Sequence, residues 1–179
     1  NFATTNNTAT ASSDYAAQTG SLTFAPGATT QQITVAVAGE TTFESDETFF
    51  VTLSNATNAT IADAQGVGTV VNDDTAPSFS ISDVTVTEGN SGTTSAVFTV
   101  TLIGATALPA TINFVTANDT ATAGTDYAAV SGTLGFAPGT TTQQVTVAVT
   151  GDVLNEANET FFVNLSGSTN ATISDTQGV

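Results

Sequence analysis

The sequence contains no lysine, arginine or histidine, and its net charge is −16 over 179 residues. Nucleic-acid binding needs cationic side chains on phosphates, and docking to anionic lipid needs a basic surface, so the composition argues against both functions. Because no side chain can form a salt bridge with a carboxylate, the cation that neutralises any crowded acidic group must come from solution.

Other absences narrow the function further. The lack of cysteine excludes disulfides and thiolate metal sites, and without histidine neither a Ser-His nor a Cys-His catalytic pair can form. Paired carboxylates could hydrolyse a glycoside, but they serve better here as metal ligands, so we predict that the protein is not an enzyme. No apolar run of about 18 residues occurs, so no membrane insertion is predicted. Because there is neither an initiating methionine nor a signal peptide, we expect a piece of a longer chain.

The residues that are present favour a folded β protein. Hydrophobic residues make up 40% of the chain and charged residues only 9%, so a core can be buried despite the net charge. Threonine, valine, alanine, asparagine and glycine dominate, and this mixture favours strands and turns over helices.

An internal repeat organises the chain. Residues Asn1–Val67 align without a gap to Asn113–Val179 at an offset of 112, and about two-thirds of the paired positions are identical. A period of this length fits a whole domain. We therefore predict the C-terminal part of a first domain at 1–74, a linker at 75–77, and at 78–179 a second domain that lacks its last strand. The missing strands belong either to a longer covalent array or to a neighbouring molecule.

Short β-rich runs separated by turn signals indicate the architecture. The predicted strands are 79–87, 95–102, 111–116, 132–136, 143–150 and 160–165 in the second copy and 66–71 in the first. About seven strands per copy without helical periodicity predict tandem seven-stranded Greek-key, immunoglobulin-like β-sandwiches.

Alternation predicts which side chains face the core of each sandwich. Phe161, Val163 and Leu165 should point inward, as should their counterparts Phe49, Val51 and Leu53. Tyr15 and Tyr127 are expected to be half-buried with their hydroxyls hydrogen-bonded.

The carboxylates recur at loops and strand ends. Asp14 and Asp126 precede the repeated tyrosine, Glu40, Glu44 and Glu47 match Asp152, Glu156 and Glu159, and Glu88, Asp73 and Asp74 lie at the ends of strands. In a Greek key these ends can converge at one pole, where the carboxylates would repel one another without a cation. Oxygen ligands without histidine or cysteine favour Ca²⁺ over zinc or copper, and Mg²⁺ prefers fewer protein ligands.

Four motifs together resemble Calx-β domains, which are calcium-binding sandwiches of sodium–calcium exchangers and of bacterial surface proteins. They are "VTVTEGNSG", "ATAGTDYAAVSGTLGFAPG", "GDVLNEANETFFVNLS" and "GTVVNDD". The resemblance implies calcium ligands at Glu88, at Asp126 and Asp14, in the acidic loops Asp152, Glu156, Glu159 and Glu40, Glu44, Glu47, and in the terminal run Asn72, Asp73 and Asp74.

The chain departs from the family pattern at two places. Gly151 and Gly39 hold a position where the family often has an aspartate, and Asn72 begins the terminal run in place of an aspartate. We therefore expect one to three calcium ions per domain.

The sequence is compatible with two functions. The near-identical copies and the short linker favour a calcium-stabilised structural repeat of an extracellular rod, adhesin stalk or filament, whose partners are neighbouring copies of the repeat. The alternative is an adhesive module that binds a glycan or a surface protein, although the aromatic anchors typical of such sites are scarce. By its resemblance the protein is expected at a bacterial cell surface or outside the cell.

Overall fold

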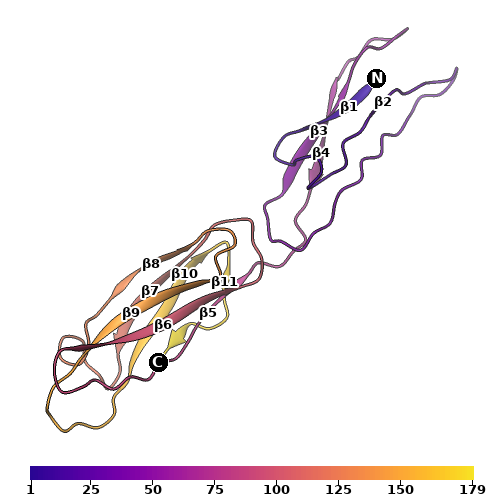
Figure 1. Ribbon diagram of the computed structural model, residues 1–179. Coiled ribbons are helices and arrows are strands. Elements are labelled where there is room, and N and C mark those ends of the chain that lie inside the picture. The colour runs from indigo at the N-terminus through magenta and orange to yellow at the C-terminus, as the bar shows by residue number, and fades with distance from the viewer. The chain divides into compact units, whose positions relative to one another are not determined.

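The computed structural model describes all residues from Asn1 to Val179, and its regular elements are all strands. No helix in it is long and apolar enough to span a membrane. The chain divides into two compact units, Asn1–Asp74 (unit 1) and Thr75–Val179 (unit 2) (Figure 1).

Unit 2 consists of two sheets. One sheet has the strand order β12-β10-β7-β8, and the other has the order β11-β5-β6-β9. The strands are β5 (Ser78–Ile81), β6 (Thr93–Ile103), β7 (Ala110–Asn118), β8 (Ser131–Phe136), β9 (Thr142–Thr150), β10 (Phe161–Thr169), β11 (Thr172–Ile173) and β12 (Gln177–Gly178). All neighbours pair antiparallel except β11 with β5, which pair in parallel.

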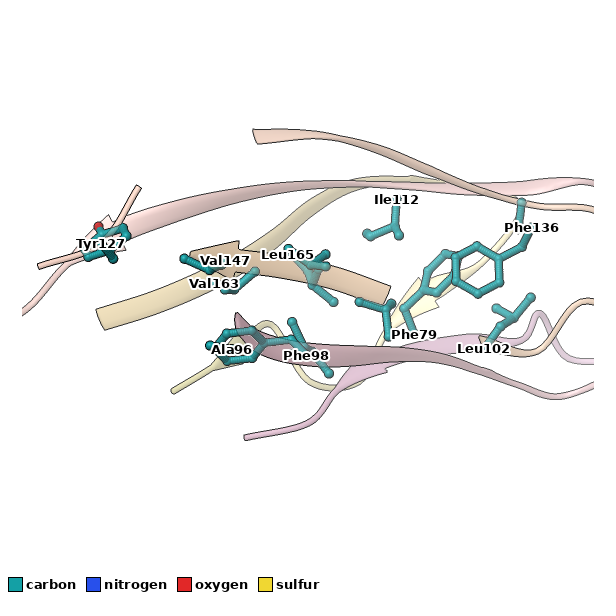
Figure 2. Close-up of a cluster of buried hydrophobic side chains, with 14 of the residues drawn as sticks. Phe79, Ala96, Phe98, Leu102, Ile112, Tyr127, Phe136, Val147, Val163 and Leu165 are labelled. Atoms are coloured by element: carbon teal, nitrogen blue, oxygen red, sulfur yellow. The ribbon is translucent and has the colours of Figure 1, made fainter. Parts of the chain in front are cut away.

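The core of unit 2 lies between these sheets, so the predicted sandwich class is confirmed. Figure 2 shows buried side chains of both sheets pointing toward one another. The Phe79 ring of β5 lies 5.0 Å from the Phe136 ring of β8, measured between centroids. Val163 and Leu165 are buried on the predicted face of β10, and Phe161 packs against the same core.

Three details of unit 2 differ from the sequence-based expectation. The predicted strand 79–87 ends at Ile81, because the chain then leaves β6 and the backbone N–H of Val84 donates to the carbonyl of Val179. The two-residue strand β12, which was not among the strands predicted for the second copy, pairs with β10 in the register that β4 has with β3 in unit 1. The short strand β11 was not predicted.

Unit 1 contains a single sheet with the order β2-β1-β3-β4. Its strands are β1 (Phe2–Asn6), β2 (Thr19–Gly20), β3 (Glu47–Leu53) and β4 (Gln65–Val70). Residues 30–38, which correspond to β9, form no strand, and Val37 makes an isolated bridge with Tyr15. In unit 2 the pairing partner of β9 is β6, and unit 1 contains no equivalent of β6.

The buried part of unit 1 is correspondingly small. Its core consists of Ala9, Tyr15 and Phe49, with the tyrosine and phenylalanine rings stacked 4.5 Å apart. Tyr15 and its counterpart Tyr127 are each only 1% exposed, so they are fully buried and not half-buried as expected. Their hydroxyls are hydrogen-bonded as predicted, to Asn6 Oδ1 and Asn118 Oδ1 respectively, at 2.7 Å.

Candidate metal centre

The first acidic residue of each cluster is fixed by a compact loop. In unit 2 the N–H of Thr122 donates to Asp126 Oδ2 at 2.7 Å, and the N–H of Asp126 donates to the carbonyl of Thr122. The next residue, Tyr127, is buried and stacks on Phe161, with ring centroids 4.4 Å apart. One carboxylate oxygen of Asp126 is therefore held by the loop, while the buried tyrosine fixes the position of the backbone.

Unit 1 builds the same loop around Asp14. The N–H of Thr10 donates to Asp14 Oδ2 at 2.6 Å, and the N–H of Asp14 donates to the carbonyl of Thr10. The backbone hydrogen bond from Thr10 is the main cause that lowers the pKa of Asp14 below its ordinary value of 3.8. This carboxylate is consequently charged at neutral pH.

In unit 2, β9 ends beside the loop that holds Asp126, and the acidic segment follows directly after β9. The N–H of Thr150 donates to the carbonyl of Asp126 at 2.8 Å, so the acidic segment 152–159 begins next to that aspartate. Gly151 is buried against the segment that follows the first strand. A Cβ atom at this position would lie 2.7 Å from the carbonyl oxygen of Glu88 and 2.8 Å from that of Gly89.

This close approach explains one departure from the family pattern. An aspartate at position 151 could not fit unless the backbone of Glu88 and Gly89 moved. That backbone positions Glu88, which is one of the predicted ligands. A Cβ atom at Gly39 would meet nothing within 4 Å, since unit 1 has no segment equivalent to 88–89. The glycine therefore has a packing role in unit 2 that it does not have in unit 1.

Carboxylates gather at this end of unit 2. Asp126, Glu156 and Glu159 each place a carboxylate oxygen within 4.8 Å of the other two. Repulsion, chiefly from Asp152, raises the pKa of Glu156, with smaller contributions from Glu159, Asp126 and Glu88. Desolvation and the charge of Asp126 raise the pKa of Glu159.

Unit 1 repeats the arrangement. Asp14, Glu44 and Glu47 have carboxylate oxygens within 4.8 Å of one another. Desolvation is the first cause that raises the pKa of both glutamates, and the neighbouring carboxylates add to it. Desolvation and then the charge of Glu40 raise the pKa of Asp74.

The structure thus brings the twelve predicted ligands into two clusters. In unit 1 they line one hollow of about 230 Å³, which contains Asp14, Glu40, Glu44, Glu47, Asn72, Asp73 and Asp74. In unit 2 the mutually repelling group consists of Glu88, Asp126, Asp152, Glu156 and Glu159. Their roles as ligands remain predictions.

Three of these residues also make hydrogen bonds that shape the cluster. Asn72 Oδ1 accepts the N–H of Glu44 at 3.0 Å, and Asn72 Nδ2 donates to the carbonyl of Asp74. Glu40 Oε2 accepts the N–H of Thr42, and Asp152 Oδ1 accepts the N–H of Leu154. Asn72 therefore ties the acidic segment of unit 1 to the run that follows β4.

The five remaining acidic residues lie outside the predicted ligand set, and each accepts a hydrogen bond. Four of them accept a backbone N–H: Asp46 accepts that of Asn72, Asp63 that of Gln65, Asp83 that of Val179 and Asp175 that of Gln177. The fifth, Asp119, accepts the hydroxyl of Thr160. Asp46 lies directly before Glu47 in the acidic run, and this adjacency is the sequence signal that points to it. Its carboxylate holds the backbone of Asn72 and so supports the hollow of unit 1.

The donor set of both clusters consists of oxygen atoms, most of them charged, with no cation from the protein among them. Hard oxygen ligands in this number suit Ca²⁺, which accepts 6–8 of them in flexible geometry. The residues present therefore fit a calcium ion, which would neutralise charges that otherwise raise one another's pKa.

The comparisons with known proteins agree with this chemistry. The family model for the Calx-beta domain matches residues 1–75 and again residues 70–177. No curated protein matches the chain. Among solved structures, the apo-form Calx CBD1 domain is 23% identical, covers 57% of this chain and 93% of its own, and superposes with a TM-score of 0.51.

Two tandem-domain structures are also similar. CBD12 from CALX1.2 is 26% identical with a TM-score of 0.45, and the calcium binding domain CBD12 of CALX1.1 is 24% identical with a TM-score of 0.44. Each covers 93% of this chain, and this chain spans 66% of the length of each.

Proposed function

The chain belongs to the Calx-beta domain family, and we propose that both of its units bind calcium through their acidic clusters. The observation that carries this proposal is the hollow of unit 1, whose lining contains all seven residues assigned as ligands there. Domains of this family bind calcium in exchangers, and CBD12 of CALX1.1 is described as a calcium binding domain. The second cluster, at the equivalent positions of unit 2, gives the same chemistry twice in one chain.

Calorimetric titration of the whole chain tests this proposal. We expect Ca²⁺ to bind at both clusters and Mg²⁺ to bind more weakly, because Mg²⁺ keeps most of its waters. At a free concentration 100 times the dissociation constant, each independent site should stabilise its unit by about 2.7 kcal/mol. Unfolding of the chain, with calcium and with a chelator, measures this stabilisation. Identical unfolding midpoints in the two conditions would refute the proposal.

We further propose that these domains are calcium-stabilised structural repeats of an extracellular rod, adhesin stalk or filament. Two copies that are about two-thirds identical support a spacer, since a repeated unit extends a chain without adding chemistry. The absence of thiols is compatible with a bacterial cell surface or extracellular location. No catalytic activity is proposed, because the carboxylates that could perform acid–base chemistry are assigned to calcium.

Small-angle scattering tests the spacer role, because it measures the maximum dimension of the chain with calcium and with chelator. Asp73 and Asp74 precede Thr75, so an ion bound there would also hold the base of the predicted linker, which Pro77 stiffens. We expect a larger maximum dimension with calcium, and equal dimensions would contradict the spacer.

An adhesive module that binds a glycan or a surface protein is the second candidate. Val153 and Leu154 of the acidic segment are 82% and 65% exposed, and an apolar tip of this kind is the feature that favours a partner. A glycan array and a Val153→Ser, Leu154→Ser double variant distinguish the two functions. A spacer binds no glycan and tolerates the double substitution.

A further inference from the structure

A side-chain hydroxyl continues the strand pairing of unit 2 past the end of β7. The backbone pairing of β7 with β10 ends at Asn118 and Phe161. Beyond this pair, the N–H of Thr160 donates to Thr120 Oγ1 at 2.7 Å, and the carbonyl of Thr160 accepts the N–H of Ala121 at 2.9 Å. The hydroxyl of Thr120 therefore takes the place of a backbone carbonyl, and the N–H of Thr160 keeps a partner after the strand has ended.

Unit 1 has the same connection at the same repeat positions. The pairing of β1 with β3 ends at Asn6 and Phe49. The N–H of Thr48 then donates to Thr8 Oγ1 at 2.8 Å, and the carbonyl of Thr48 accepts the N–H of Ala9 at 2.9 Å. The connection is therefore a repeated feature of both units, although the strands around it differ.

In both units this connection lies directly beside a predicted calcium ligand. Glu159 precedes Thr160, and Glu47 precedes Thr48. The N–H that Thr120 accepts belongs to the peptide group that joins Glu159 to Thr160. Because a peptide group is planar, holding its N–H fixes the direction in which the backbone leaves the glutamate.

The same short segment also holds the other part of the cluster. Asn118 Oδ1 accepts the hydroxyl of Tyr127 at 2.7 Å and a backbone N–H of the loop that carries Asp126. Asp126 and Glu159 have carboxylate oxygens within 4.8 Å of one another. Asn118 and Thr120, two residues apart, therefore hold the two segments whose carboxylates meet.

The residue between them differs between the units. Asp119 accepts the hydroxyl of Thr160, whereas Asn7 Nδ2 donates to Thr48 Oγ1 at 2.7 Å. The direction of this hydrogen bond is reversed in unit 1, and the negative charge is absent there. The feature that both units share is thus the threonine hydroxyl that accepts the backbone N–H.

We propose that Thr120 and Thr8 are positioning residues of the calcium sites, and that they hold Glu159 and Glu47 in their clusters. Each threonine acts through the backbone of the glutamate and not as a ligand. Without the hydroxyl, the peptide group would turn toward water and the glutamate would leave the cluster for part of the time. Removing an outer group that orients a metal ligand typically costs about 10- to 100-fold in affinity. This proposal rests on the proposed calcium binding.

Matched substitutions in the whole chain test the positioning role. Thr120→Val removes the hydroxyl but keeps the shape of the side chain, and calorimetry should show calcium binding about tenfold weaker in unit 2 and unchanged in unit 1. Thr8→Val should give the reverse, and Thr120→Ser, which keeps a hydroxyl, should retain the affinity. The control is Thr133→Val on β8, which removes an exposed hydrogen bond to Asn113 outside either cluster and should change neither site.

A second measurement separates positioning from a loss of stability. The chain has two tyrosines, Tyr15 and Tyr127, and each directly follows the aspartate of a cluster. In a Tyr15→Phe background, Tb³⁺ bound at unit 2 is excited through Tyr127, and its emission lifetimes in H₂O and D₂O count the waters on the ion. Thr120→Val should raise this count, because water replaces Glu159, whereas lower stability alone would leave it unchanged.

The outcomes separate this proposal from the proposed function. An unaltered chain that binds no calcium would overturn both. If the unaltered chain binds calcium and Thr120→Val has the same affinity, or weaker binding with an unchanged water count, the positioning role alone is wrong. Weaker binding that Thr120→Ser shares would also overturn it, because the hydroxyl would then not be the cause.

Discussion

Units 1 and 2 carry closely similar sequences but different structures. Residues 30–37 of unit 1 and 142–149 of unit 2 differ only by an isoleucine in place of a valine. The second segment is part of β9, and the first forms no strand. Because the local sequence is almost unchanged, its intrinsic strand propensity cannot explain the difference. The pairing partner β6 and the core behind it explain it, as expected for β structure.

The largest expected effect follows from one matched pair of substitutions. Phe136→Ala removes a buried ring in contact with Phe79 and should destabilise unit 2 by about 3–5 kcal/mol. Phe24→Ala, at the same repeat position, removes a ring that is 52% exposed and should change stability by less than about 0.5 kcal/mol. Chemical denaturation of the whole chain measures both. Equal losses would mean that Phe24 is buried in solution.

Calcium binding provides the next comparison between the units. Glu159→Gln and Glu47→Gln each remove one charge from a triad whose carboxylate oxygens lie within 4.8 Å of one another. Each substitution should weaken calcium binding in its own unit by at least about tenfold, which corresponds to about 1.4 kcal/mol. Calorimetry on both variants separates the two sites. Asp83→Asn is the matched control, since Asp83 accepts the N–H of Val179 outside either cluster and should leave affinity unchanged.

A smaller difference concerns one loop residue. Ser12 has φ of 86°, and its counterpart Gly124 has φ of 97°. Positive φ is unfavourable for a residue with a Cβ atom, so Ser12→Gly should stabilise unit 1 and Gly124→Ser should destabilise unit 2, each by about 1 kcal/mol. Thermal unfolding of the two reciprocal variants checks the signs. Opposite signs would show that the serine side chain contributes more than the backbone strain costs.

The fold was predictable from the sequence where the pattern is local. Alternation along β6, β7, β9 and β10 located these strands to within a few residues. The split after Ile81 was not predictable, because it depends on the pairing of Val84 with Val179, which are far apart in sequence. The fate of residues 30–38 was missed for the same reason, since strand formation there requires a partner that unit 1 does not contain.

The candidate site was predictable as two groups of residues but not in its geometry. The recurrence of acidic positions at an offset of 112 and the family resemblance together selected the twelve residues. Neither could reveal that Asp46 holds the backbone of Asn72, or that Gly151 lies against Glu88 and Gly89. These contacts depend on the packing of loops from different parts of the chain.

The smallest expected effect is a dependence of stability on pH that reverses its sign when calcium is added. In the metal-free chain the pKa values of Glu44, Glu47, Glu156 and Glu159 are raised above 4.5. Between pH 4.5 and these raised values the folded state binds more protons than the unfolded state, so stability rises as the pH falls from 7. Asp14 does not oppose this trend in that range, because its pKa is lowered and its contribution is lost only below about pH 3.8.

Calcium should reverse this trend because it binds the deprotonated carboxylates and so lowers their pKa values in the folded state. Stability should then fall as the pH falls toward 4.5. Unfolding curves at several pH values between 7 and 4.5, in chelator and in saturating calcium, measure both slopes. Glu156→Gln should flatten the metal-free slope of unit 2 while leaving that of unit 1 unchanged. Parallel slopes in chelator and in calcium would mean that the carboxylates whose pKa values are raised are not those that hold the ion.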